Sequence, residues 1–278
     1  MAYYPGCSLG STAIEYDQSS RAVCSALGLD LVELEDWSCC GATSAHNLDH
    51  LLSVVLPARN IALAQPRGLD VAVPCAACFS RLRKADHTLR HDKGTRREVE
   101  EVIGFKYEGK IRVLSLLEGL VSGVGLDRIA ARVVSPLRGL KVVCYYGCLM
   151  VRPPEVSGFD RVENPVMMDH LVEVLGGESL MWSYKTDCCG AGLALTNTPV
   201  VEKLVRRLAG AAREAGASAI VTACPLCQSN LEMRQDQGTK IPSFYFTELV
   251  GMALGLKEAR GWLGKHLVDP GPALACQK

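Results

Sequence analysis

The sequence has no excess of charge of either sign. Thirty lysines and arginines balance thirty aspartates and glutamates over 278 residues. A chain without net charge has no general electrostatic attraction for nucleic acid or for an anionic membrane surface. Nucleic-acid binding is therefore not expected.

Long hydrophobic runs are also missing, since no stretch reaches the roughly 18 apolar residues that a membrane span requires. The first residues lead directly into Tyr4-Pro5-Gly6-Cys7, which leaves no room for the basic and apolar segments of a signal peptide. We therefore expect a soluble, cytoplasmic protein without a membrane span.

Cysteine, in contrast, is abundant, with 13 copies. An odd number of cysteines with adjacent and C-x-x-C spacings suits metal ligation better than a disulfide framework. This usage also fits a reducing compartment, in agreement with the cytoplasmic expectation.

Ten of the cysteines form one pattern twice. The first copy consists of Tyr4-Pro5-Gly6-Cys7, Cys39-Cys40-Gly41 and Cys75-Ala76-Ala77-Cys78, and the second of Tyr146-Gly147-Cys148, Cys188-Cys189-Gly190 and Cys224-Pro225-Leu226-Cys227. In both copies 33 residues separate the glycine from the C-x-x-C pair. The repeat predicts two tandem domains, residues 1–139 and 140–278.

A fainter repeat extends the unit beyond the cysteines, because residues 110–118 resemble residues 240–248. The charged segment 91–108 has no counterpart in the second half. We interpret it as a solvated insertion rather than as a surface for a partner.

Hydrophobic periodicity predicts alternating strands and helices in both halves. The predicted strands are 2–5, 29–34, 70–73, 140–146, 179–182 and 219–222, and the predicted helices are 12–27, 47–65, 165–175 and 199–215, with a further helix starting at each C-x-x-C pair. Ser11 or Thr12 is the expected cap of the first helix, and Asn47 that of the second. The alternation predicts an α/β fold of two duplicated domains, each a small, mainly parallel sheet flanked by helices.

The motif cysteines of each half follow three different predicted strands. In an open parallel sheet, groups at the carboxyl ends of the strands gather in one place. The C-x-x-C pair also lies at a helix start, where free amides favour thiolates. The sequence therefore predicts one cluster of five thiols in each half.

Five thiols exceed the four ligands of tetrahedral zinc, whereas a multi-iron cluster offers several points of attachment. We therefore favour iron and sulfur over zinc. A zinc-stabilised scaffold is the alternative.

The remaining cysteines lie outside the repeat. Cys24 and Cys144 fall in apolar patterns and are interpreted as small core residues, and Cys276 as a surface thiol. Trp37 and Trp182, which precede the double cysteines, are either lids over the clusters or core aromatics.

Other polar and small residues near the motifs have weaker signals. His46 and Lys185 are weak candidates for protonating a product thiolate or attracting an anionic substrate. His50 and His170 are interpreted as packing or surface residues. Gly41 and Gly190 are expected to allow a positive φ or a close backbone approach.

The duplicated pattern C-x31-CCG-x33-C-x-x-C and C-x39-CCG-x33-C-x-x-C resembles the cysteine-rich CCG domains of the heterodisulfide reductase B-subunit family over nearly the whole chain. The resemblance implies two noncubane [4Fe-4S] clusters that face each other across the domain interface. It implies as ligands of the first cluster Cys7, Cys39, Cys40, Cys75 and Cys78, and of the second Cys148, Cys188, Cys189, Cys224 and Cys227.

The same resemblance implies a catalytic subunit that reductively cleaves a small-molecule or protein-bound disulfide between the clusters, or runs the reverse or a related sulfur oxidation. The family's namesake substrate is the mixed disulfide of coenzymes M and B. The implied partners are a ferredoxin-like protein and a flavin protein, which resemble the C and A subunits of heterodisulfide reductase, respectively. The alternative is a non-catalytic iron-sulfur electron-transfer subunit of a dehydrogenase complex, because CCG domains also occur in such complexes.

Overall fold

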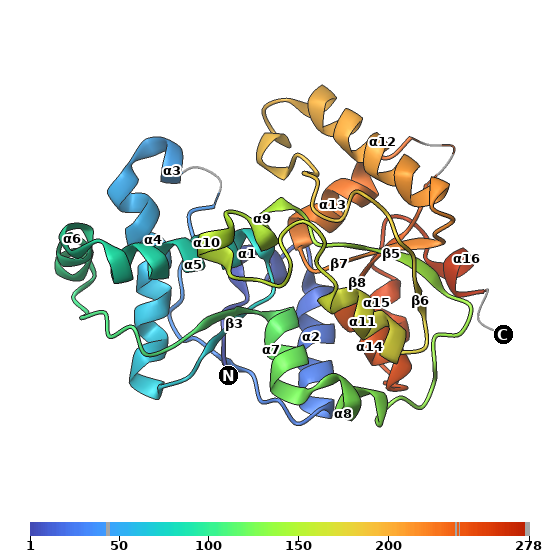
Figure 1. Cartoon of the computed structure of the whole chain (residues 1–278), viewed down its shortest axis with the longest axis horizontal. Coiled ribbons are helices and arrows are strands. Elements are labelled where there is room, and N and C mark those ends of the chain that lie inside the picture. Colours follow the sequence, from blue (N-terminus) through green and yellow to red (C-terminus); the bar gives the residue numbers. More distant parts are fainter. Residues whose placement is uncertain (43–44, 237, 239, 276–278) are drawn as a thin grey trace.

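A computed structural model describes residues 1–42, 45–236, 238 and 240–275 (Figure 1). It contains two four-stranded sheets. The strands of the first sheet are β1 (Ala2–Tyr3), β2 (Val32–Glu33), β3 (Val71–Val73) and β4 (Val113–Ser115), and those of the second are β5 (Lys141–Tyr145), β6 (Glu178–Ser179), β7 (Ala219–Thr222) and β8 (Ser243–Tyr245).

Helices connect and cover the strands. In the first half they are α1 (Gly6–Leu9), α2 (Ile14–Ala26), α3 (Ala45–Leu48), α4 (His50–Ala64), η1 (Gln65–Arg67), α5 (Ala76–His91), α6 (Lys93–Ile103), α7 (Leu116–Val124) and α8 (Leu126–Ala130). In the second half they are α9 (Cys148–Val151), α10 (Pro154–Ser157), α11 (Met167–Val174), η2 (Ala191–Leu193), α12 (Thr198–Glu214), α13 (Pro225–Met233), α14 (Phe246–Ala253), α15 (Ala259–Leu263) and α16 (Gly271–Leu274).

All strand pairs are parallel, in the orders β2-β1-β3-β4 and β6-β5-β7-β8. The predicted α/β class with two duplicated parallel sheets is therefore confirmed. Each sheet has a fourth strand, β4 or β8, which arises from the fainter repeat. The strand order reverses between β1 and β3 and between β5 and β7, and such switch points are where ligands bind in open α/β sheets.

The edge strands β2 and β6 are less buried than the other strands, since even the opposite edge strands β4 and β8 are largely buried. The central strands β3 and β7 are buried along their whole length, as expected where helices cover both faces of a parallel sheet. The edge strands β2 and β6 are only two residues long and partly or fully exposed. The predicted strands 29–34 and 179–182 are therefore longer than the observed ones, because an edge strand pairs on one side only.

Both predicted helix caps are wrong. Asp49 caps α4, its carboxylate accepting from the Leu52 amide at 2.7 Å, whereas Asn47 lies inside α3. Ala13 stands at the cap position of α2, and the Ser11 hydroxyl donates to the Cys7 carbonyl oxygen instead.

The charged segment 91–108 is packed as well as solvated. Its first residue ends α5, and most of the rest forms α6, which Asp92 caps through the Gly94 and Thr95 amides at 2.8 and 3.1 Å. α6 packs against α4 and α5 and buries Val99 completely. The insertion is thus a structured outer helix of the first half.

The two halves share one continuous core. α2 packs against α14, and α11 packs against α7, so that these four helices lie together (Figure 1). α1 likewise packs against α13, and α9 against α5. These four contacts between the halves form two pairs with the halves exchanged, as an approximate two-fold relation requires, whereas the packing of α10 on α5 has no such counterpart. No helix in the described ranges is both long and apolar enough to cross a membrane.

Candidate functional site

The ten motif cysteines lie where the strands end. Cys7 lies in α1, directly after β1, and Cys148 starts α9, directly after β5. Cys75 and Cys224 stand at the cap positions of α5 and α13, which follow β3 and β7. The single cysteines and the C-x-x-C pairs therefore flank the two switch points of the sheets.

Within each half the thiols approach one another in the same order. The Cys40 and Cys78 sulfurs lie 3.3 Å apart, and the Cys189 and Cys227 sulfurs 3.5 Å apart. The further neighbouring pairs are Cys7 with Cys39, Cys75 with Cys78, Cys148 with Cys188, and Cys224 with Cys227. The duplicated sequence motif is thus a duplicated arrangement in space.

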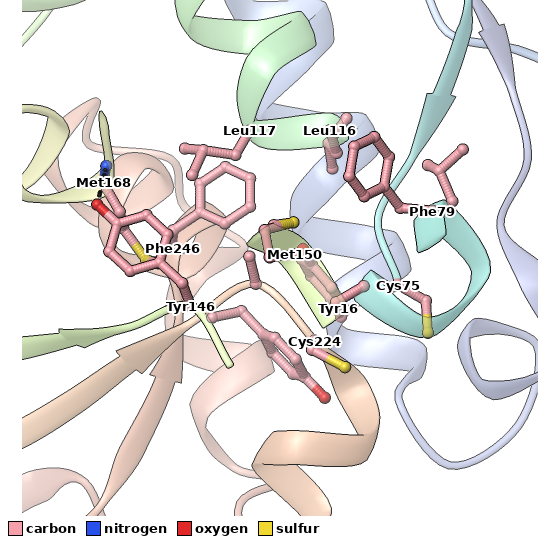
Figure 2. Close-up of a cluster of buried hydrophobic side chains, with 14 of the residues drawn as sticks. Tyr16, Cys75, Phe79, Leu116, Leu117, Tyr146, Met150, Met168, Cys224 and Phe246 are labelled. Carbon is pink, nitrogen blue, oxygen red and sulfur yellow. Dashed lines mark hydrogen bonds between the residues drawn. The ribbon is translucent and has the colours of Figure 1, made fainter. Parts of the chain in front are cut away.

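The two sets meet at Cys75 and Cys224, which interact across the boundary between the halves. The Ala76 amide at the start of α5 also donates toward the Cys224 sulfur. Figure 2 shows both cysteines within one buried cluster that includes Tyr16. One cysteine of each set is therefore placed at the centre of the molecule.

A cavity of about 60 Å³ lies beside the second set, and all five of its cysteines line it. Ala76 and Ala77 of the first half also line it. The volume is several times the roughly 10–15 Å³ that one water molecule requires. In the described part of the chain no three or more Cys, His, Asp or Glu side chains are arranged to hold a metal ion directly. Five thiols around a cavity that both halves line fit a cluster with several points of attachment.

The double-cysteine loops depend on their glycines. Gly41 and Gly190 have φ of 72° and 80°, as expected. Their amides donate to the Cys39 and Cys188 sulfurs at 3.4 and 3.3 Å. A Cβ on Gly41 would lie 2.8 Å from the Ala45 Cβ, so a side chain is excluded there by space as well as by conformation.

A buried tyrosine anchors each of these loops. The Tyr4 hydroxyl donates to the Ser38 carbonyl oxygen at 2.8 Å, and the Tyr145 hydroxyl to that of Asp187 at 2.7 Å. Each acceptor directly precedes a double cysteine. The structural counterpart of Tyr4 is therefore Tyr145 rather than Tyr146. A tyrosine three residues before the first cysteine of each set is the sequence signal that could have identified this role.

The two tryptophans pack on these anchors. Trp37 meets Tyr4 edge-on with ring centroids 5.6 Å apart, and its indole donates to Glu33. Trp182 lies 6.2 Å from the Tyr145 ring and donates to the Cys144 carbonyl oxygen. Both are half-buried and support the anchoring tyrosines.

His46 and Lys185 have different surroundings. His46 is exposed with Nδ1 3.2 Å from the Arg81 guanidinium, whose charge lowers the pKa of His46 and favours its neutral form. The buried Lys185 ammonium lies 2.9 Å from the Asp169 carboxylate and donates to the Pro165 carbonyl oxygen. These partners occupy Lys185 within the protein, and we assign it no role toward a substrate.

The cysteines and histidines outside the motifs lie where the sequence predicted them, in the core or on the surface, as far as the structure describes them. Cys24 and Cys144 are completely buried, and burial raises the pKa of Cys24 to about 12. His50 and His170 are exposed on α4 and α11. Cys276 lies outside the described residues.

Within each thiol pair the hydrogen bond lowers the pKa of one cysteine and raises that of the other. The hydrogen bond between Cys40 and Cys78 lowers the pKa of Cys40 to about 7, and the one between Cys148 and Cys188 lowers that of Cys188 to about 6. The pKa of Cys78 and that of Cys148 rise correspondingly. Each half thus contains a thiol that is readily converted to the ligating thiolate form.

Cys188 and Cys39 occupy equivalent, exposed positions but differ in pKa. The hydrogen bond with Cys148 lowers the pKa of Cys188 to about 6, whereas partial desolvation raises that of Cys39. In the iron-free protein at pH 7 we expect iodoacetamide to alkylate Cys188 roughly tenfold faster than Cys39. Peptide mass spectrometry over a time course measures both rates in one sample. Equal rates would contradict the assigned pKa difference.

The family model for the CCG cysteine-rich domain matches residues 1–83 and 142–232, once in each half. The chain belongs to this family. The resemblance seen in the motifs is thereby confirmed, and the matched ranges contain all ten motif cysteines.

Relatives similar over nearly their full length carry two kinds of name. The chain is 33% identical to the 8-methylmenaquinol:fumarate reductase membrane anchor subunit of Wolinella succinogenes, over 96% of each chain. It is 29% identical to the B subunit of the ferredoxin/F420H2-dependent CoB-CoM heterodisulfide reductase of Methanosarcina acetivorans, over 92% of this chain and 89% of the relative.

A crystal structure of a hypothetical protein from Helicobacter pylori shares the fold, with a TM-score of 0.76 at 14% sequence identity. The match covers 96% of this chain but only 51% of that chain. This likeness concerns the fold alone.

Proposed function

We propose that this protein is the catalytic subunit of a heterodisulfide reductase-like complex, which reductively cleaves a disulfide between two noncubane [4Fe-4S] clusters or runs a related sulfur oxidation. The observation that carries the proposal is the pair of equivalent five-cysteine sets that meet at Cys75 and Cys224. The proposed ligands are Cys7, Cys39, Cys40, Cys75 and Cys78 for one cluster, and Cys148, Cys188, Cys189, Cys224 and Cys227 for the other.

When bound, each cluster would supply one electron and one iron site for sulfur, so that a two-electron reduction divides into paired steps. The protein's own residues have supporting roles. The Gly41 and Gly190 amides donate to ligand sulfurs, and Tyr4 and Tyr145 fix the loops. The largely apolar cavity lining limits water near the second set. Because the Arg81 charge favours the neutral form of His46, this histidine is not proposed as the proton donor.

The proposed partners are a ferredoxin-like protein and a flavin protein, resembling the C and A subunits of heterodisulfide reductase, with the complex in the cytoplasm. Exposed cysteines offer a place for electron entry, since Cys7, Cys39 and Cys188 all reach the surface.

A second candidate function is that of a non-catalytic electron-transfer protein within a larger complex. The name of the Wolinella succinogenes relative, which belongs to a fumarate reductase, favours it. In that case the clusters would pass electrons onward without binding sulfur compounds.

Exposing the chemically reduced, anaerobic protein to disulfides separates the two candidates. We expect the coenzyme M–coenzyme B disulfide, or another small disulfide from a panel, to change the cluster spectra and to release thiols. An S-alkylglutathione, a thioether without a cleavable sulfur-sulfur bond, is the control. If no disulfide changes the spectra or yields thiol, the protein only transfers electrons.

A further inference from the structure

Two tyrosines from opposite halves stack at the centre of the molecule. Tyr16 of α2 and Tyr245 at the end of β8 have ring centroids 4.0 Å apart and planes within 5° of parallel. Both side chains are completely buried. Beside them the Ser19 and Thr247 hydroxyls lie 2.7 Å apart across the same boundary. This stack therefore belongs to the contact between α2 and α14.

Tyr16 also contacts the segment that carries a motif cysteine. Its hydroxyl donates to the Pro74 carbonyl oxygen at 3.2 Å, and Pro74 directly precedes Cys75. Cys75 in turn interacts with Cys224 of the other half. A chain of contacts thus runs from Tyr245 through Tyr16, Pro74 and Cys75 to Cys224. Figure 2 shows Tyr16, Cys75 and Cys224 in the same buried cluster.

The stack is not a product of the duplication. Ser115 holds the place of Tyr245 in the first half, since each ends its fourth strand and donates its amide to the carboxylate of Glu118 or Glu248 at 2.9 Å. The duplicated fold keeps the glutamate but has no ring in the first half. Among the described residues no stacked aromatic pair joins α7 to α11. The equivalent contact between α7 and α11 is therefore made without a stack.

We propose that Tyr16 is a positioning residue that fixes the spacing between the two cysteine sets, through its stack on Tyr245 and its hydrogen bond to Pro74. The proposal rests on the proposed function, because spacing matters only where one disulfide must reach both sets. A misplacement of about 1 Å can lower a rate about 100-fold when reacting groups must be aligned.

Two single-atom deletions separate positioning from packing. Tyr16→Phe keeps the ring and removes the hydrogen bond to Pro74. Tyr245→Phe is the matched control, because the buried Tyr245 hydroxyl has no hydrogen-bond partner in the described part of the chain. Tyr16→Leu removes the stack itself. If the stack only packs the core, the two Phe variants should behave alike.

The test is the distance between the two iron sites in the anaerobically purified protein, located by anomalous diffraction at the iron edge. We expect Tyr245→Phe to keep the wild-type distance, whereas Tyr16→Phe and Tyr16→Leu change it by roughly 0.5 Å or more with unchanged iron content. A wild-type distance in both Tyr16 variants would overturn the proposal and leave the proposed function intact. A wild-type protein without two iron sites would overturn both.

Discussion

Replacing Cys189 with alanine is expected to remove one of two iron-sulfur clusters and to keep the other. The Cys189 sulfur is buried, lies 3.5 Å from that of Cys227 and lines the cavity of the second set. Iron should fall from about eight to about four per chain in Cys189→Ala. Iron analysis and the visible absorption spectrum measure the loss.

Cys144→Ala is the matched control for this prediction. Cys144 is buried in the same half, but it lies on β5 and has Ser179 as its side-chain neighbour rather than a motif cysteine. We expect it to keep about eight irons, with a stability loss of about 1–2 kcal/mol at most. Full iron content in Cys189→Ala would contradict the ligand assignment.

Replacing His266 with glutamine is expected to cost about 3–5 kcal/mol of unfolding free energy. The completely buried imidazole lies between two buried carboxylates, with Nδ1 2.9 Å from Glu232 and Nε2 3.0 Å from Glu248. Removing the positive charge of the imidazolium leaves two buried carboxylates without a neighbouring cation. Denaturant unfolding measures the loss, and the exposed His170→Gln should stay within about 0.5 kcal/mol of wild type.

The same residue predicts a pH dependence. Burial opposes the charge, but the hydrogen bonds to Glu232 and Glu248 outweigh it and raise the pKa of His266 from 6.5 to about 10. A raised pKa gives stability that is fully present below the unfolded pKa and lost as pH rises through the folded one. Wild-type stability should therefore fall between about pH 6.5 and 10, and His266→Gln should lack this fall. Parallel pH profiles would contradict a charged His266.

The site was predictable because its signal is local and repeated. Equal spacing of 33 residues between each glycine and C-x-x-C pair, together with the position of the cysteines after apolar runs, is enough to place the thiols at strand ends. Gly41 and Gly190 were likewise identified by the positive φ that a tight loop requires.

Features that depend on few residues or on distant partners were not predictable. β4 and β8 have three residues each, too few for a periodicity signal. Asn47 and Asp49 are both good cap residues, so residue type does not choose between them, and in the structure Asp49 accepts the hydrogen bond from the Leu52 amide. The Tyr16–Tyr245 stack and the Cys75–Cys224 contact join residues from opposite halves, and no sequence spacing connects them.

The boundary at residues 139 and 140 stays a prediction. α2 packs against α14, and α7 packs against α11, so contacts cross that boundary on both sides of the molecule. The two halves share one core. A fragment that contains only one of the two halves would expose this shared core surface to solvent.

Metal and sulfide analysis of the anaerobically purified protein tests the central claim most directly, which is that each half holds an iron-sulfur cluster. We predict about eight irons and eight acid-labile sulfides per chain. Zinc in stoichiometric amount without sulfide would contradict the account and would instead support a zinc-stabilised scaffold.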